Sequence, residues 1–320
     1  MRYLVTGCAG FIGYNTCKKL LETGNSIIGI DNLNDYYNPI VKKKRLALLK
    51  KNKNFEFIKL DISKYKDLMK KLDGKEIDLI IHLAAQAGVR YSIENPWVYE
   101  QSNSIGTLNI FEFAKEKKIS KIVYASSSSV YGGVKEEWVE TSALATPVSM
   151  YAATKLHNEQ TAYVYYKLQG IKSIGLRFFT VYGEYGRPDM SLWLFTKNIL
   201  NNKPIDVYNQ GDMRRDFTYI LDIVDGIISA TSYDCEYEVF NLSANNTVEL
   251  EYVISLIENE LGIKAVKNYM PMQKGDVQET RGNIEKARNL LGYNPKVNIE
   301  KGIKNFVNWF KKNQKWINKL

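Results

Sequence analysis

Short apolar runs alternate with longer segments of helical spacing up to about residue 180. The apolar runs span residues 3–6, 26–30, 55–59, 79–82, 121–125 and 174–178, and a helical pattern follows the first run to about Thr23. Strand, helix and strand in repeated order are typical of a parallel sheet with helices on both faces. The pattern therefore predicts an α/β fold with a doubly wound parallel sheet.

The alternation becomes irregular after about Val181, where strand-like and helical patterns are mixed among loops such as residues 185–190 and 273–282. This remainder is too short and too interleaved to form an independent unit. We expect a main domain of residues 1–180 plus about 217–243. The rest, about 181–216 and 244–320, should form a smaller mixed α/β lobe packed against the sheet.

Basic residues give the 320-residue chain a formal net charge of +9. They gather in segments such as residues 42–45, 50–51 and the C-terminal region, none of which carries a nucleic-acid recognition motif. The segment 36–53 is longer than a usual βα connection, and VKKKRLALLKK has helical spacing, which predicts a surface helix with a solvated basic face. The charge favours at most a small anionic substrate, and no nucleic-acid partner is expected.

The composition disfavours two further classes of protein. No run approaches the roughly eighteen apolar residues of a membrane span, and a strand-like run rather than a signal peptide follows Met1. Cys8, Cys17 and Cys235 are scattered without metal-ligand spacing. We expect a cytoplasmic protein that neither enters membranes nor holds a metal.

The sequence VTGCAGFIG places Gly7, Gly10 and Gly13 directly after the first predicted strand, at the start of a helix. The first glycine permits a tight turn, the second lets backbone N–H groups approach a pyrophosphate, and the third allows helix and strand to pack closely. The helix N-terminus attracts negative charge. This context predicts a dinucleotide site, to which Phe11 and Ile12 also contribute.

The second predicted strand ends in Asp31, whose carboxylate can accept hydrogen bonds from both adenosine ribose hydroxyls. It would repel a 2′-phosphate, and no arginine follows it directly, so NAD is favoured over NADP. Asn32 and the pair Asp61 and Ile62, which follow the second and third strands, are expected near the adenosine. Asp61 could instead cap the next helix.

The fourth predicted strand ends in HLAAQ. The small residues would let a cofactor lie close to the backbone, so Leu83, Ala84 and Ala85 are assigned to the cofactor site. His82 lies within the strand, where a histidine is more commonly a hydrogen-bonded core residue than a catalyst.

The sequence MYAATK carries Tyr151 and Lys155, four residues apart and therefore on one face of a helix. An ammonium beside a phenol lowers the phenol's pKa, which would make Tyr151 a general base for a sugar hydroxyl. Such a pair is weak evidence alone. Combined with a dinucleotide site and the serine-rich strand end SSSS, it indicates a dehydrogenase-type reaction.

These motifs resemble the extended short-chain dehydrogenase/reductases, and the whole chain is most similar to their UDP-glucuronate 4-epimerase group. The resemblance is carried by GCAGFIG, GIDNLNDYY, HLAAQAGVRYS, YASSSSVYG, YAATK, LRFFTVYG, GRPDM, RDFTYI and GDV. It implies a tightly bound NAD that takes hydride from carbon 4 of a UDP-sugar and returns it to the opposite face, through a 4-keto intermediate. Tyr151 would remove the hydroxyl proton, and Lys155 would also contact the nicotinamide ribose.

The resemblance also implies roles for several polar residues. Ser127 matches the family's catalytic hydroxyl, and Asn103 matches a position near the nicotinamide ribose, although it could simply satisfy neighbours inside a helix. Ser128 and Ser129 stand where dehydratases carry an Asp-Glu pair and where decarboxylases carry a glutamate at the second position. Hydroxyls there could hold a substrate carboxylate without repelling it.

Further substrate contacts follow from the same resemblance. Thr180 could add a hydroxyl, and Arg187 and Arg90 are candidate cations near the carboxylate or diphosphate, or structural ion pairs. Arg215 matches a diphosphate-binding arginine, and Asp276 matches a position near the UDP ribose. Many hexose epimerases read Arg-Pro-Gly-Asp where this chain reads QKGD, so Lys274 or Arg281 would have to replace the missing cation.

Alternative substrates are a neutral UDP-hexose and a UDP-N-acetyl uronic acid, and a redox sensor without turnover is disfavoured by the intact Ser127, Tyr151 and Lys155. The resemblance also implies a homodimer, formed through two long helices over residues 98–117 and 151–168.

Overall fold

The computed structural model describes residues 1–134, 137–142 and 146–320, and its largest element is a parallel seven-stranded sheet. All six strand pairings in this sheet are parallel. From edge to edge the strands are β10 (Tyr237–Leu242), β6 (Lys172–Phe178), β5 (Lys121–Ser127), β4 (Leu79–His82), β1 (Arg2–Thr6), β2 (Ser26–Asp31) and β3 (Phe55–Lys59). The predicted α/β fold class is confirmed.

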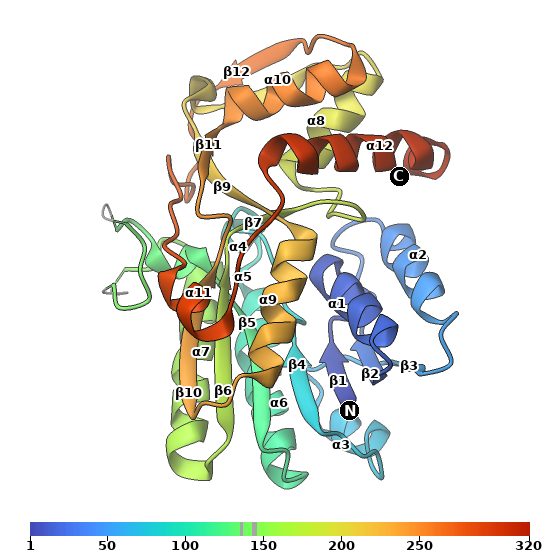
Figure 1. Ribbon diagram of the computed structural model, residues 1–320, viewed down its shortest axis with the longest axis vertical. Coiled ribbons are helices and arrows are strands. Elements are labelled where there is room, and N and C mark those ends of the chain that lie inside the picture. The colour runs from blue at the N-terminus through green and yellow to red at the C-terminus, as the bar shows by residue number, and fades with distance from the viewer. Residues whose placement is uncertain (135–136, 143–145) are drawn as a thin grey trace.

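Helices cover both faces of the sheet (Figure 1). Within strand β1, Tyr3 and Val5 join the core on one face, while Leu4 joins the core on the other, as the period of two in a strand requires. The first face carries α1 (Phe11–Glu22), α9 (Ile220–Ser232) and α11 (Glu285–Leu291), and the second carries α3 (Tyr65–Lys71), α6 (Gly106–Glu116) and α7 (Met150–Gln169).

A smaller group of elements lies beyond the ends toward which the parallel strands point (Figure 1). It has its own apolar core, centred on Trp193, Phe306 and Phe310. One small sheet has the strand order β11 (Thr247–Glu249), β9 (Arg214–Tyr219), β7 (Thr180–Tyr182), and a second pairs β12 (Lys267–Met270) with β8 (Ile205–Tyr208). The helices of this part are α8 (Ser191–Leu200), α10 (Leu250–Leu261) and α12 (Ile299–Ile317). The division of the chain into a main domain and a lobe at the boundaries given above stays a proposal.

The order of the strands reverses between β1 and β4, because the chain leaves β1 toward β2 and β3 and then returns to build the other half of the sheet. In open α/β sheets a crevice forms at this point, beyond the carboxyl ends of the strands. The glycine-rich turn after β1 and residues 83–86 after β4 meet there.

Two helical segments differ from the sequence-based expectation. The helix expected over residues 98–117 is built from α5 (Pro96–Tyr99), a π-helical segment (Glu100–Ile105) and α6, preceded by the short α4 (Tyr91–Glu94). Helix α2 (Pro39–Leu49) forms as expected, but its basic face is not fully solvated, since Lys42 is 6% and Arg45 0% exposed. The prediction of a simple surface helix was wrong on this point, because the loop at Tyr185 and Gly186 packs against α2.

We predict that Gly13→Ala strongly destabilises the protein. A Cβ atom at position 13 would lie 2.1 Å from the carbonyl oxygen of Gly7, and backbone on both sides must move to relieve the clash. Overpacking of this kind costs about 3 kcal/mol or more in the free energy of unfolding, measured by urea denaturation. The control is Gly133→Ala, whose Cβ would meet no atom of the described residues within 4 Å. Equal free energies of unfolding for the two variants would contradict the close approach of Gly13 to the Gly7 carbonyl.

Candidate active site

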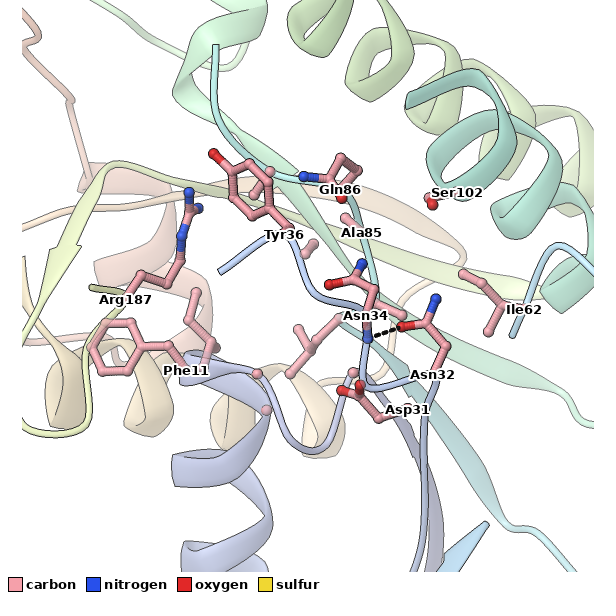
Figure 2. A pocket seen from close by; sticks show the side chains of 18 of the residues that line it. Phe11, Asp31, Asn32, Asn34, Tyr36, Ile62, Ala85, Gln86, Ser102 and Arg187 are labelled. Atoms are coloured by element: carbon pink, nitrogen blue, oxygen red, sulfur yellow. Dashed lines mark hydrogen bonds between the residues drawn. The ribbon is translucent and has the colours of Figure 1, made fainter. Parts of the chain in front are cut away.

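A cavity of about 250 Å³ opens at the crevice between β1 and β4. Figure 2 shows Tyr36 and Arg187 at one end, Ile62 and Ser102 at the other, and Asn32 and Asn34 between them. The lining includes fourteen of the fifteen residues predicted for the cofactor: Gly7, Gly10, Phe11, Ile12, Gly13, Asp31, Asn32, Asp61, Ile62, Leu83, Ala84, Ala85, Tyr151 and Lys155. The one that does not line it is Asn103.

The glycine-rich turn is shaped for close approach of a ligand to the backbone. Gly7 has φ +70°, and a Cβ there would lie 2.8 Å from the backbone nitrogen of Ala84. Helix α1 begins directly after Gly10, so its free N–H groups and the positive end of its dipole face the cavity. This cradle, which side chains would fill, fits the pyrophosphate of a dinucleotide.

Asp31 is fixed at the end of β2 by the backbone around it. One carboxylate oxygen accepts the N–H of Ala9 at 3.1 Å and the other accepts the N–H of Leu33 at 2.8 Å. Burial raises the pKa of Asp31, while the N–H of Leu33 and the charge of Lys42 oppose that rise. Each oxygen keeps a lone pair, so the group can still receive the two ribose hydroxyls.

Asp61 forms a local turn rather than a helix cap. Its carboxylate accepts the backbone N–H of Ser63 at 2.9 Å and the side-chain amide of Asn32 at 3.1 Å, and α3 begins only at Tyr65. Both Asp61 and Asn32 line the cavity. The two loops are thereby tied together where the adenosine is expected.

His82 is a core histidine, as its position within the strand predicted. Its ring nitrogens lie 2.7 Å from the hydroxyl of Thr6 and 3.0 Å from that of Thr107. Burial, with a smaller contribution from Lys155, lowers the pKa of His82 to about 3, so the ring is neutral.

Asn103 hydrogen-bonds its neighbours, and its predicted place near the nicotinamide ribose stays a prediction. Its side chain bonds the backbone N–H and C=O of Gln86 at 2.8 and 3.0 Å and the hydroxyl of Thr154 at 3.0 Å. The amide is fully buried, and these contacts fix the loop after β4 against α7. Asn103 therefore acts on the cavity through Gln86, which lines it.

The three predicted catalytic residues come together at the cavity wall. Ser127 ends β5, and its hydroxyl lies near enough to the phenol of Tyr151, in the first turn of α7, to lower the pKa of that phenol. Ser149 caps that helix by accepting the N–H of Ala152 at 3.1 Å. Lys155, one turn later, donates to the carbonyl of Ala125 at 2.8 Å.

The pKa of Tyr151 moves in the opposite direction from the one expected. Burial raises it, and the neighbouring hydroxyl of Ser127 and the charge of Arg187 only reduce that rise. Burial also lowers the pKa of Lys155 to about 8, against the attraction of Glu159. The sequence could not reveal that desolvation of both groups outweighs the effect of their neighbours.

Arg187 lines the end of the cavity and is already engaged with an acid. Its guanidinium bonds both carboxylate oxygens of Asp189, at 3.0 and 2.5 Å, and Tyr36 donates to the same carboxylate at 3.1 Å. These contacts join the loop after β2 to the loop before α8. Thr180 lies in a small adjoining cavity that Arg187 also lines.

The four serines have separate surroundings. Ser127 faces the cavity and lies 3.2 Å from the hydroxyl of Ser129, whereas Ser126 donates to Glu159 at 2.6 Å in the interior. Ser128 and Ser129 form a short 3₁₀ turn and are not among the residues that line the main cavity. Ser129 is connected to the cavity through Ser127.

The residues predicted for the nucleotide half of a substrate form a cluster. Arg215 bonds one oxygen of Asp276 at 2.7 Å, and Arg90 lies 3.6 Å from the other and over the ring of Tyr208. Arg281 instead lies 3.9 Å from Glu137. Arg90 is therefore the second cation that the structure places beside Asp276.

Several residues that line the cavity were missed from the sequence: Asn34, Tyr36, Tyr37, Lys42, Gln86, Ser102 and Met190. Lys42 donates to the carbonyl of Asn34 at 2.8 Å and acts electrostatically on Asp31. Its position eleven residues after Asp31, inside a lysine run, gave no basis for singling it out.

The glycine cradle, the fixed Asp31 and the Tyr151 and Lys155 pair together define a dinucleotide-dependent enzyme. The chain belongs to the NAD dependent epimerase/dehydratase family, whose model matches residues 3–243. It is an NAD-dependent enzyme of the sugar epimerase class, an isomerase, and NAD is its cofactor.

Full-length similarity supports this membership. The chain is 57% identical to an uncharacterized protein of Methanocaldococcus jannaschii, over 99% of this chain and 98% of that one. It is 44% identical to a UDP-glucuronate 4-epimerase of Thermodesulfobacterium geofontis, over 97% and 96%. The structure of a UDP-glucuronic acid 4-epimerase from Bacillus cereus, in complex with UDP-glucuronic acid and NAD, matches with a TM-score of 0.91 and 34% identity, over 98% and 99% of the two chains.

Neither a metal-binding group nor a membrane-spanning helix occurs in the part of the chain that the structure describes. Within residues 1–134, 137–142 and 146–320, no three His, Cys, Asp or Glu side chains gather as metal ligands would. Over the same ranges, every helix is too short or too polar to span a bilayer.

We predict that Asp31→Ser changes the cofactor preference toward NADP. The substitution removes the carboxylate that repels a 2′-phosphate and leaves the charges of Lys42 and Arg45 nearby. The ratio of NADP to NAD affinity should rise by about tenfold or more, corresponding to the loss of one unfavourable charge contact. Fluorescence titration with each cofactor measures it. Asp61→Asn, in the same cavity, should leave the ratio unchanged, and an unchanged ratio in Asp31→Ser would contradict the role of Asp31.

Proposed function

We propose that the protein epimerises carbon 4 of a UDP-uronic acid and interconverts UDP-glucuronate and UDP-galacturonate. The proposal rests on one observation: Tyr151, Ser127 and Lys155 lie together at the wall of the cavity that the glycine-rich turn and Asp31 also line. The relatives named above as UDP-glucuronate 4-epimerases support the choice of sugar.

Bound NAD supplies a reversible hydride acceptor for carbon 4 of the sugar. Tyr151 takes the proton of the 4-hydroxyl, and Ser127, whose hydroxyl lies near the phenol, orients that hydroxyl and shares the proton. The ammonium of Lys155, held on the carbonyl of Ala125, stabilises the phenolate. After the sugar has turned about its diphosphate linkage, Tyr151 returns the proton.

The uronate carboxylate makes the 4-keto intermediate prone to decarboxylation. A 4-keto uronic acid is a β-keto acid and loses CO₂ when the breaking bond stands perpendicular to the carbonyl plane. Positions 128 and 129 carry hydroxyls rather than acids, and Ser129 is joined to Ser127. Ser127, Ser129 and Thr180 would donate to the carboxylate and hold it in another orientation, while Arg187 supplies positive potential at that end.

The nucleotide half of the substrate would bind between the main sheet and the smaller part. The Arg215 fork suits a diphosphate oxygen, and Asp276 can accept a ribose hydroxyl. Arg90 adds a second positive charge beside Asp276.

An apolar face on α5, α6 and α7 supports the expected homodimer. Trp97 of α5 and Leu168 of α7 are 78% and 72% exposed, and Leu108 of α6 and Val164 of α7 are about half exposed. We propose that this face packs on a second copy as a four-helix bundle.

The function is tested by incubating the purified protein with UDP-glucuronate, without added NAD, and following the sugar by ¹H NMR. The expected product is UDP-galacturonate, because NAD that is regenerated in each cycle need not be supplied. A UDP-pentose would show decarboxylation and refute the proposed control of the carboxylate. Turnover of UDP-galactose but not UDP-glucuronate would refute the choice of sugar.

We predict that Tyr151→Phe lowers kcat by about 10²-fold to 10⁴-fold, because it removes the proton acceptor while leaving the ring and its packing. Retained NAD, read from absorbance after gel filtration, controls for folding. Activity equal to that of the unsubstituted protein would exclude Tyr151 as the base.

We predict that kcat/KM falls as the pH rises through about 8. Burial lowers the pKa of Lys155 to about 8, so the ammonium that stabilises the phenolate is present below that pH and is lost above it. The measurement is initial rate against pH, with unfolding followed over the same range. A flat profile up to about pH 10, the usual pKa of a lysine, would show that the charge of Lys155 is not needed.

A further inference from the structure

Three consecutive residues at the end of β5 each contact one of three residues on α7. The hydroxyl of Ser127 lies near the phenol of Tyr151 and lowers its pKa, and the carbonyl of Ala125 accepts from Lys155 at 2.8 Å. Between them in sequence, Ser126 donates to Glu159 at 2.6 Å. Positions 151, 155 and 159 are one helical turn apart and lie on one face of α7. The contacts of Tyr151 and Lys155 belong to the catalytic group, and the contact of Glu159 lies one turn further along α7, in the interior.

Glu159 is 4% exposed, and both of its carboxylate oxygens accept hydrogen bonds. Arg177 of β6 donates to these oxygens at 2.9 and 2.8 Å, in the two-pronged geometry that fixes a carboxylate most firmly. Arg177 also donates to the phenol of Tyr131 at 2.8 Å. The Ser126 contact is therefore made to a carboxylate that cannot rotate.

The charged groups near this row include Arg177, which is paired with Glu159, and Arg187, whose charge acts on Tyr151, whereas the imidazole and the phenols packed against it are uncharged. His82 of β4 faces Lys155 and is neutral, since burial lowers its pKa to about 3. Tyr124 of β5 and Tyr237 of β10 face Glu159, and burial raises the pKa of both phenols. The negative charge of Glu159 raises the pKa of Lys155, against the larger effect of burial.

We propose that Glu159 is a positioning residue for Tyr151 and Lys155. Its carboxylate supplies the buried negative charge that the Lys155 ammonium needs, and its contact with Ser126 fixes the position of α7 against β5. A buried ammonium without a nearby anion is disfavoured relative to the neutral amine. The position of α7 matters because Tyr151 and Ser127 must stay close together while the substrate turns. The activity readout rests on the proposed function, whereas the second readout below does not.

The test compares Glu159→Gln with Arg177→Met. Both variants break the same buried ion pair and should lower the urea midpoint, so loss of stability does not distinguish them. Glutamine can still accept from Ser126, but it removes the negative charge. We expect the alkaline limb of kcat/KM to move down by about one pH unit in Glu159→Gln, roughly a tenfold loss above that limb. In Arg177→Met, where Glu159 keeps its charge, the limb should stay at the pH of the unsubstituted enzyme or lie above it.

The second readout is the titration of Lys155 itself in the NAD-bound protein, followed by NMR of ¹³Cε-labelled lysine and assigned with Lys155→Arg. The midpoint should fall in Glu159→Gln and not in Arg177→Met, whichever sugar the enzyme accepts. If Glu159→Gln does not fold, the double variant Glu159→Gln/Arg177→Met leaves no unpaired charge from this ion pair and should still show a fall, no larger than that of the single variant. Midpoints equal to that of the unsubstituted protein would overturn the proposal, while a correct midpoint shift without turnover of UDP-glucuronate would refute only the proposed function.

Discussion

The packing of α7 against the end of β5 is the interaction on which the site depends. Tyr151 and Lys155 are carried by a helix, Ser127 by a strand, and neither element alone can place a phenol beside a hydroxyl. The helix is fixed at its start by the Ser149 cap and along its length by polar contacts to consecutive strand residues. Since hydrogen bonds are directional, these contacts specify one register, which apolar packing alone would leave free to slide.

The cavity is surrounded by cations that are desolvated before any ligand arrives. Arg45 is fully buried and donates to the carbonyls of Ala9, Tyr185 and Gly186. Lys42 donates to the carbonyl of Asn34, whereas Arg187 is hydrogen-bonded to a carboxylate. Carbonyl groups satisfy the N–H donors without cancelling the charge. The region therefore keeps a positive potential suited to a dinucleotide and a nucleotide-sugar, both of which carry a diphosphate.

The strands and the glycine turn could be predicted because their causes are local. Apolar runs rich in β-branched residues predicted six strands of the sheet nearly to their boundaries, and the spacing from Gly13 to Asp31 reflects one βαβ unit. The features that the sequence did not predict depend on contacts distant in sequence. The burial of Arg45 requires the loop at Tyr185, the hydrogen bonds of Asn103 require a π-helical segment, and the pKa directions of Tyr151 and Lys155 require the burial of both groups. Arg90 was named as a candidate, but its place beside Asp276 follows only from the packing of two loops.

The pairing of Arg187 with Asp189 bears on how a uronate would be distinguished from a neutral sugar. A free arginine would bind a carboxylate strongly, but here Asp189 already takes the Nε and Nη2 edge of the guanidinium, and Tyr36 holds that acid in place. A substrate carboxylate cannot displace Asp189 without leaving a partly buried acid unpaired, which is costly. Asp189 then limits a substrate carboxylate to the remaining N–H groups of Arg187 and partly cancels its positive potential, so neutral donors such as Ser127, Ser129 and Thr180 would share in recognition. Neutral donors hold a carboxylate less tightly, and this suits an enzyme in which the sugar must release its contacts and turn before hydride returns.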